Sequence, residues 1–251
     1  MLSIKNLSKA YAKSNVYAVS NLSLELRPGE VVGFLGSNGA GKSTTLKCLT
    51  GILPFSIGRI NINGYDIQTQ SLQAKTSLGY VPDNHFVYEK LTGIEYLNFM
   101  ADMYNVPRDL RRQRIEFFAH KFSMMDKLAS NIKSYSHGMR QKICVMGSLL
   151  HNPKLWVLDE PLTGLDPQSS YRLKQYMKEH AEAGNTVFFS SHVLAVVEQL
   201  CDSIAIIDNG HLIVYDRLEN IKSKLGQDAN LEQIFLKLVD KTYEEGGYYQ
   251  A

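Results

Sequence analysis

The segment GSNGAGKST has the residue types of a phosphate-binding loop. It follows an apolar run and precedes a segment that can begin a helix, which is the setting such a loop requires. Its glycines let successive backbone N–H groups point toward one phosphate, while Lys42 can reach the outer phosphates and the Ser43 hydroxyl can bind Mg²⁺. A plain glycine-rich turn is the alternative, but the complete GxxxxGKS pattern favours phosphate binding. The loop consists of Gly36, Ser37, Asn38, Gly39, Ala40, Gly41, Lys42, Ser43 and Thr44.

Two neighbouring carboxylates, Asp159 and Glu160, end the apolar run LWVLDEP. Ligands of open α/β sheets lie at the carboxyl ends of the strands, so Asp159 is placed to hold the water shell of Mg²⁺. Glu160 is placed to polarise an attacking water, because phosphoryl transfer to water depends on positioning the nucleophile. By itself such a pair is more often a helix cap or a solvated edge, and the phosphate loop upstream favours the chemical role.

The spacing of apolar residues predicts the elements that must position these groups. Strands are expected over Leu22 to Leu26, at EVVGFLG, in a hairpin around Asn63-Gly64, and at LWVLDE, TVFFSS and IAIID. Helices are expected on the faces Ile94, Leu97, Ala101, Tyr104 and Met139, Ile143, Met146, Leu150, after Asp166-Pro167, and over 230–239, whereas the final EEGGYYQA should fray. Strands and helices alternate in the last third, which indicates a parallel sheet.

Composition limits the classes of protein that this chain can be. Its 251 residues are 44% hydrophobic and 21% charged, which is ordinary for globular proteins and excludes disorder. Lys and Arg number 27 against 25 Asp and Glu, a net charge of +2, so a broad basic face for nucleic acid is not expected. No apolar run approaches the ~18 residues that span a bilayer, and the N-terminus has no signal-peptide pattern, so we expect a soluble intracellular chain. Cys48, Cys144 and Cys201 lack CxxC spacing, which predicts reduced core thiols.

The chain resembles the ATP-binding cassette (ABC) ATPases. Five motifs follow one another in the order and spacing of that family, and a phosphate loop alone would be far less specific. They are GSNGAGKST, SHGMRQK from Ser136, LWVLDEP, TGLDP from Thr163 and SSH from Ser190. The resemblance runs from about Leu2 to Asp216 and implies an α/β fold: a P-loop NTPase core with a mostly parallel sheet, an N-terminal antiparallel β subdomain and an inserted α-helical subdomain.

The resemblance also implies roles for single residues. Tyr11 matches the aromatic residue that stacks on adenine, with an ordinary strand tyrosine as the alternative. Ser136 and Gly138 match the signature segment, which contacts the γ-phosphate of ATP held by the other subunit, so the working unit is a dimer. Asp166 matches the loop that crosses the dimer interface. His192 matches the switch histidine, which joins Lys42 and Glu160 in the catalytic set and contacts the γ-phosphate and Glu160.

Two positions depart from the family pattern. His137 stands where the signature segment usually has its first glycine. Asp83, in GYVPD, stands where the family has a glutamine, and it is either a turn residue after Pro82 or a ligand of Mg²⁺ beside Ser43 and Asp159. We favour the ligand role, because a carboxylate oxygen suits Mg²⁺ or its waters.

The implied activity is hydrolysis of ATP to ADP and phosphate, with ATP and Mg²⁺ bound. The signature form and LEQIF near the C-terminus look most like nucleotide-binding subunits of bacterial exporters with separately encoded permeases. We therefore expect an integral-membrane permease as partner, a homodimer or a dimer with a related ATPase, no nucleic acid, and a peripheral place on the cytoplasmic face of the cell membrane. The alternative is a soluble ABC ATPase without a transport role, such as one in iron–sulfur assembly. A metabolic P-loop kinase would have no use for SHGMRQK.

The segment NHFVYEKLTGIEYLNFM is the expected route of coupling to a permease. Phe86, Tyr88 and Tyr96 look exposed there, with ordinary core positions as the alternative. The expected organisation is one ATPase domain, 1–216, and a C-terminal helical extension, 217–251. Within the domain we expect β-rich parts at 1–35 and 56–80, P-loop core at 30–55 and 151–216, and a helical block at 84–150.

Overall fold

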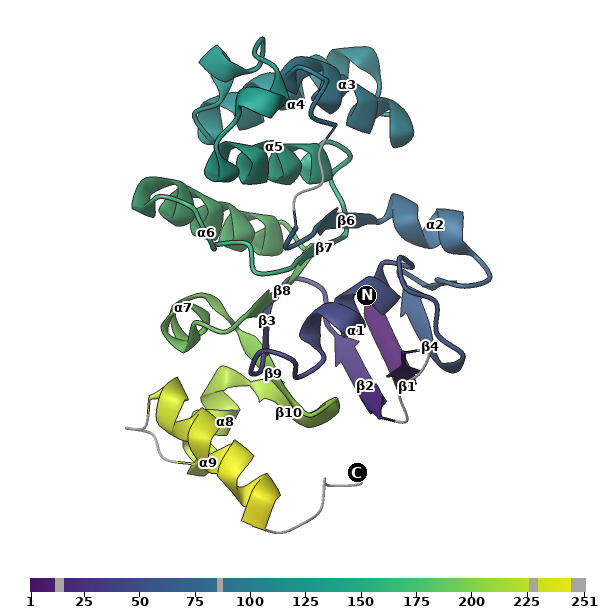
Figure 1. The fold of residues 1–251 in the computed structure, drawn as a ribbon, viewed down its shortest axis with the longest axis vertical. Coiled ribbons are helices and arrows are strands. Elements are labelled where there is room, and N and C mark those ends of the chain that lie inside the picture. Colours follow the sequence, from purple (N-terminus) through teal and green to yellow (C-terminus); the bar gives the residue numbers. More distant parts are fainter. Residues whose placement is uncertain (12–15, 85–87, 226–229, 245–251) are drawn as a thin grey trace.

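The computed structural model describes residues 1–11, 16–84, 88–225 and 230–244. These residues form a six-stranded sheet in the order β10-β9-β3-β8-β7-β6 and a four-stranded sheet in the order β2-β1-β4-β5. The larger sheet crosses the middle of the molecule, with a helical block at one end and the C-terminal helices at the other (Figure 1). The predicted α/β fold, with a mostly parallel sheet, an antiparallel N-terminal sheet and inserted helices, is confirmed.

The larger sheet is parallel except for its edge strand β10, which pairs antiparallel with β9. Its strands are β3 (Val31–Leu35), β6 (Leu78–Val81), β7 (Leu155–Leu158), β8 (Thr186–Ser191), β9 (Ser203–Asp208) and β10 (His211–Arg217). Both faces are covered, which explains the continuous apolar runs in the sequence. In β7, Leu155 and Val157 pack into one core, while Trp156 and Leu158 pack into the other.

The smaller sheet is antiparallel and consists of β1 (Leu2–Ala10), β2 (Tyr17–Leu26), β4 (Ile57–Ile62) and β5 (Tyr65–Asp66). Asn63 and Gly64 join the last two strands with φ values of 51° and 88°, as the predicted hairpin requires. Helix α1 (Lys42–Leu49) buries Leu46 and Leu49 in the core that this sheet shares with the larger one. This packing fixes the start of α1 against the central sheet.

Three helices form the helical block: α3 (Gly93–Met103), α4 (Arg108–Lys121) and α5 (His137–Leu149). Thr92 starts α3 with a capping box, accepting from the Glu95 amide while the Glu95 carboxylate accepts from the Thr92 amide. Two short 3-10 turns, Met125–Lys127 and Ile132–Ser134, lead from α4 into α5. The buried side chains of the block form one continuous hydrophobic core with those on the face of the larger sheet that carries Trp156.

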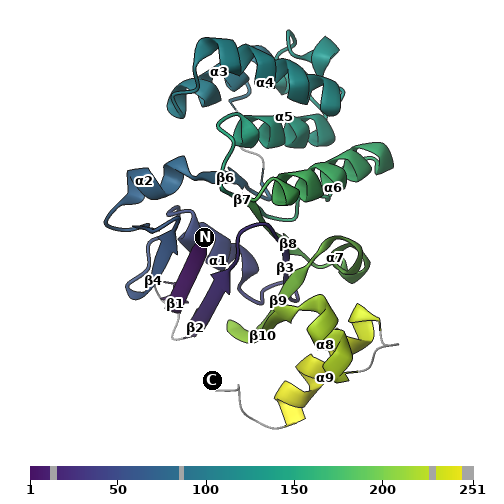
Figure 2. The ribbon, with the colours of Figure 1, turned by 180° about the vertical axis from the view of Figure 1, so that it is seen from behind.

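The remaining helices are α2 (Ser71–Thr76), α6 (Pro167–Glu182), α7 (Leu194–Leu200), α8 (Leu218–Leu225) and α9 (Leu231–Glu244). Figure 2 shows α6 next to the helical block and α8 and α9 at the opposite end of the molecule. Glu198 of α7 links these last helices, pairing with Lys222 of α8 at 2.5 Å and accepting from the Leu231 amide at 3.4 Å. Among the described residues, no helix has the length and apolar character needed to cross a membrane.

Most predicted elements are confirmed, and the structure adds others. Helix α9 buries Leu231 and Ile234, two of the apolar positions that predicted it. Of the segment EEGGYYQA that is expected to fray, Glu244 is the last residue of α9, and 245–251 lie outside the described residues. Helix α2 is not predicted, while α4 and α8 lie within the expected helical block and C-terminal helical extension but are not predicted as separate helices. Within 56–80, β6 pairs with β7 in the parallel sheet and not with the antiparallel strands. The proposed division of the chain at 216 stays a prediction.

Candidate functional site

A cleft of about 370 Å³ lies over the phosphate loop. The loop leaves the end of β3 and enters α1, so it stands at the carboxyl edge of the parallel sheet, where open α/β sheets bind ligands. The cleft is lined by Tyr11, Ala18, Ser37, Asn38, Gly39, Gly41, Lys42, Ser43, Thr44, Asp83 and Glu160. Glu160 follows β7 and Asp83 follows β6, so residues far apart in sequence meet at this edge.

The phosphate loop has the backbone of an anion site. Gly41 has φ 110°, and a Cβ there would come within 2.4 Å of the Ala18 carbonyl oxygen, so only glycine fits. No side chain caps the start of α1, which leaves its first N–H groups directed at the cleft. Lys42 is buried, and its ammonium donates to the Gly36 carbonyl at 2.7 Å and to the Ser37 carbonyl at 3.1 Å. Burial lowers the pKa of Lys42, while the charges of Glu160 and Asp159 act in the opposite direction.

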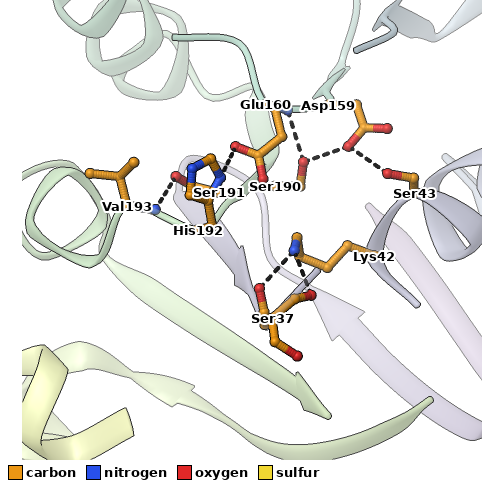
Figure 3. A network of polar contacts seen from close by, with 10 residues as sticks. Ser37, Lys42, Ser43, Asp159, Glu160, Ser190, Ser191, His192 and Val193 are labelled. Carbon is orange, nitrogen blue, oxygen red and sulfur yellow. Dashed lines mark hydrogen bonds and ion pairs between the residues drawn. The ribbon is translucent and has the colours of Figure 1, made fainter. Parts of the chain in front are cut away.

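The acidic pair at the end of β7 is held by polar contacts from two other elements (Figure 3). Asp159 is 2% exposed, and its Oδ1 accepts from the Ser43 hydroxyl at 3.2 Å and from the Ser190 hydroxyl at 2.6 Å. Glu160 has φ 50°, and its backbone N–H donates to Ser190 Oγ at 2.9 Å. Nδ1 of His192 lies 3.0 Å from Glu160 Oε2. The start of α1, the acidic pair and His192 therefore form one network.

Tyr11 and Asp83 lie at the rim of the same cleft. The Tyr11 side chain is 46% exposed, and its hydroxyl is 3.0 Å from the Thr44 hydroxyl. A ring with one exposed face beside a phosphate loop can stack on a planar base. Asp83 is exposed two residues beyond the end of β6. Its carboxylate can therefore bind a cation or a water in the cleft.

Three predicted site residues lie apart from this cleft. Ser136 is exposed and caps α5, accepting from the Met139 amide at 3.3 Å. Asp166 is exposed and caps α6, accepting from the Ser169 amide at 2.9 Å, and hydrogen bonds from Ser169 lower the pKa of Asp166. Neither these two nor Gly138 is among the described residues that line the cleft. The chain thus brings together the phosphate loop, the acidic pair and His192, and leaves the signature segment on another surface.

Two contacts join the signature segment to the loop that follows Glu160. A Cβ added at Gly164 would lie 2.5 Å from the His137 ring, so the imidazole rests directly on this glycine. The buried Gln141 side chain donates to the Pro161 carbonyl. Neither Gln141 nor Ser190 has a role of its own among the predicted site residues. Ser190 directly follows the apolar run TVFF, where a buried polar group needs a partner, whereas Gln141 lies between Arg140 and Lys142 and gives no such signal.

Comparison with known proteins agrees with this geometry. The family model described as "ABC transporter" matches residues 19–163. The linearmycin resistance ATP-binding protein LnrL of Bacillus subtilis (strain 168) is 36% identical over 232 residues, which cover 92% of this chain and 74% of the relative. A solved structure described as the ATP binding subunit of an ABC transporter is 31% identical, covers 95% of this chain and 99% of its own, and superposes with a TM-score of 0.90.

A second solved structure shares the fold at 22% identity and a TM-score of 0.79, covering 87% of this chain and 99% of its own. It is described as the dimeric, post-hydrolysis state of an ATP-binding cassette with ADP and phosphate bound. The family model spans more than half of this chain, and the linearmycin resistance relative aligns over nearly all of it. We conclude that the chain belongs to the ABC transporter family, as one of its ATP-binding ATPases.

Proposed function

We propose that this protein is the ATP-hydrolysing subunit of an exporter. It drives a separately encoded integral-membrane permease from the cytoplasmic face of the cell membrane. The relative from Bacillus subtilis is named as a resistance ATP-binding protein, and moving a toxic compound out of the cell is one way to confer resistance. The permease, and not this chain, recognises the transported compound. The alternative of an ATPase without a transport role has no specific observation in its favour.

Each residue of the cleft has a place in ATP binding. Tyr11 stacks on the adenine, and the backbone from Gly36 to Thr44 cradles the phosphates. Lys42 exchanges its two carbonyl partners, 2.7 and 3.1 Å away, for oxygens of the outer phosphates. This exchange offsets the desolvation of the ammonium, because a phosphate provides a full negative charge where the carbonyls provide only dipoles.

Ser43, Asp83 and Asp159 would hold Mg²⁺, directly or through water. All three side chains offer oxygen atoms, which this cation prefers. The Ser43 hydroxyl oxygen already lies 3.2 Å from Asp159 Oδ1. When bound, Mg²⁺ supplies charge neutralisation between the outer phosphates. Glu160 would orient the attacking water and accept its proton, and His192 would fix the Glu160 carboxylate, 3.0 Å away, while its exposed ring remains available to the γ-phosphate.

The signature segment acts on the nucleotide of a second subunit. The Ser136 hydroxyl, the Gly138 N–H and the start of α5 together form an anion-binding helix terminus that points outward. Asp166 lies in the adjoining loop and would cross the interface. The partner is a second copy of this chain or a related ATPase, and each nucleotide then contacts Lys42 of one subunit and Ser136 of the other.

The observation that carries the permease proposal is an exposed aromatic pair on the helical block. Tyr88 is 60% exposed and meets Phe99 of α3 edge to face, with ring centroids 5.3 Å apart. Met103, 65% exposed, lies one turn further along α3. Tyr96 is core, and Phe86 lies outside the described residues. Because Asp83 lines the nucleotide cleft and is five residues from Tyr88, ATP and a permease docked on this pair can act on one segment.

A membrane-retention experiment tests the proposal. Tyr88→Glu should lower the fraction bound to membranes of the native cells by about tenfold, since it places a charge in an apolar contact. Tyr171→Glu is the matched control, because Tyr171 is 59% exposed on α6 and should leave binding unchanged. Equal retention of the two variants would place the docking surface elsewhere. In the complex, Asp83→Ala should lower permease-stimulated turnover more than basal turnover, and equal losses would contradict this coupling route.

A further inference from the structure

We propose that Ser190 is a positioning residue for ATP hydrolysis, whose single hydroxyl fixes both the Glu160 backbone and the Asp159 carboxylate. It is 0% exposed at the end of β8. Its Oγ donates to Asp159 Oδ1 at 2.6 Å and accepts from the Glu160 N–H at 2.9 Å. A serine hydroxyl has one proton to donate, so that proton is committed to Asp159 (Figure 3). The inference rests on the roles proposed above for the two acids.

The backbone of Glu160 needs such a support. Its φ of 50° is left-handed, a conformation that costs a residue with a side chain about 1 kcal/mol. Residues in such conformations persist only where their surroundings determine them. The Asp159 N–H is held by the Val81 carbonyl at 2.9 Å in the neighbouring strand, and the next N–H along the chain is held by Ser190. Removing the hydroxyl leaves that amide without its partner and frees the turn that aims the Glu160 side chain.

The position of Ser190 at the end of β8 explains why this serine serves the site. Ser190 lies in β8, and His192 lies one residue beyond the end of that strand. The first holds the Glu160 amide and the second lies 3.0 Å from its carboxylate. Ser191 projects to the other side, where its Oγ accepts from the Val193 N–H at 3.0 Å. The end of β8 therefore grips Glu160 at both its backbone and its side chain.

The hydrogen bond from Ser190 to Asp159 also remains when Ser43 of the phosphate loop changes its partner. Asp159 Oδ1 accepts from both Ser43 and Ser190. When Ser43 turns toward a nucleotide and its cation, the bond from Ser190 remains to orient the carboxylate. A buried, charge-assisted bond of 2.6 Å is strong enough for that task.

The test compares Ser190→Ala with Ser191→Ala, which removes a buried hydroxyl from the next position of the same strand. Loss of a group that orients a cation ligand typically costs 10- to 100-fold. We expect Ser190→Ala to lower kcat by about tenfold or more with KM for ATP within about twofold, and Ser191→Ala to change neither by more than about twofold. Ser190→Thr, which keeps the hydroxyl, should recover most of the lost kcat.

A binding measurement separates positioning from general damage. Affinity for a fluorescent ATP analogue in EDTA should match wild type in Ser190→Ala, while the Mg²⁺ concentration that half-restores tight binding should rise about tenfold. Equal kcat losses in the two alanine variants, or an unshifted Mg²⁺ dependence together with an unchanged kcat, would overturn the proposal. If Ser190→Ala does not fold, Ser190→Cys takes its place with the same expectations, because its thiol is a weaker donor of similar shape.

A reference variant keeps this inference separate from the proposed site. Glu160→Gln should be inactive under the same conditions. If that variant turns over ATP at the wild-type rate, the proposed role of Glu160 is wrong whatever Ser190 does. If Glu160→Gln is inactive while Ser190→Ala matches Ser191→Ala, the site stands and the role of Ser190 is wrong.

Discussion

The carboxyl edge of the parallel sheet and the start of α5 are the two regions proposed above to meet phosphate, and they differ in how much of a site one chain assembles. At the sheet edge, three separate segments meet: the phosphate loop with Lys42 and Ser43, the end of β7 with Asp159 and Glu160, and the end of β8 with His192. Ser43 contacts Asp159, His192 contacts Glu160, and Lys42 contacts the Gly36 carbonyl of its own loop. Each strand ends at the same edge, so the topology itself gathers them.

At the start of α5, Ser136 caps its own helix and faces outward, away from the described lining of the cleft. The residues after Ser136 contact the loop that follows Glu160: the His137 ring lies against Gly164, and the Gln141 side chain donates to the Pro161 carbonyl. The start of α5 thus packs against the loop that follows Glu160, but it does not line the nucleotide cleft of its own chain. The difference supports the proposal that the chain carries two halves of a site, which a second subunit would bring together.

The largest expected effect comes from breaking the sheet edge. Glu160→Gln keeps the shape and hydrogen bonding of the side chain but removes the carboxylate that orients water. A positioned general base contributes about 10²- to 10⁴-fold, so turnover should fall by about a thousandfold while ATP affinity stays within about twofold. Phosphate release and equilibrium binding of a fluorescent nucleotide measure the two quantities. Turnover above about a tenth of wild type would remove Glu160 from the catalytic set.

The second effect comes from breaking the signature end. Ser136→Arg removes the hydroxyl and blocks the helix terminus, so turnover should fall by about a hundredfold, the scale of losing a preorganised donor. ATP binding to the single chain should be unchanged, because Ser136 does not line its cleft. A nucleotide titration at a protein concentration too low for dimers to form tests this separation. Weaker binding by the isolated variant would mean that the signature segment serves its own nucleotide.

The smallest expected effect concerns the packing between the helical block and the larger sheet. Burial lowers the pKa of His151 to about 4 and that of His180 to about 4. His151 stacks on Tyr104 with ring centroids 3.6 Å apart and lies 3.1 Å from the Leu78 carbonyl oxygen at the start of β6. A change of charge here therefore acts on the connection that carries α5.

The sign of the pH effect follows from these shifts. The folded chain keeps both rings neutral where the unfolded chain protonates them, so stability is constant above about pH 6.5 and falls as the pH drops toward 4. At pH 5 the loss is about 2 kcal/mol per histidine. The unfolding midpoint should fall between pH 7 and pH 5, and His151→Gln should remove about half of that fall. A flat profile for the wild-type chain would contradict the neutral burial of these rings.

Local patterns made the sheet edge largely predictable from sequence. The phosphate loop and the pair Asp159–Glu160 are contiguous motifs next to apolar runs, so their chemistry and their strands could be read together. The signature residues, Asp166 and His192 came from family resemblance. The Asn63-Gly64 hairpin and the Asp166-Pro167 helix start were predictable because turn and cap residues act locally.

The rest depended on long-range packing. Helix α4 has a narrow apolar face, with Ile115, Phe118 and Ala119 buried among charged residues, so its period is weak in the sequence. Ser190 became visible as a partner of Asp159 and Glu160 only when β7 and β8 lay side by side. The range 56–80 is expected only to be β-rich, and the membership of β6 in the parallel sheet became visible with its pairing to β7, because sheet membership depends on pairing and not on the strand's own sequence.

Light scattering of Glu160→Gln with MgATP tests the two-halves account most directly, because blocked hydrolysis should trap the assembled site. The account predicts a particle of twice the 28.3 kDa of one chain with MgATP, the single-chain mass without nucleotide, and the single-chain mass again when Ser136→Arg is added. A Glu160→Gln chain that stays at 28.3 kDa with saturating MgATP at high protein concentration, or a dimer that Ser136→Arg does not disrupt, would contradict the composite site.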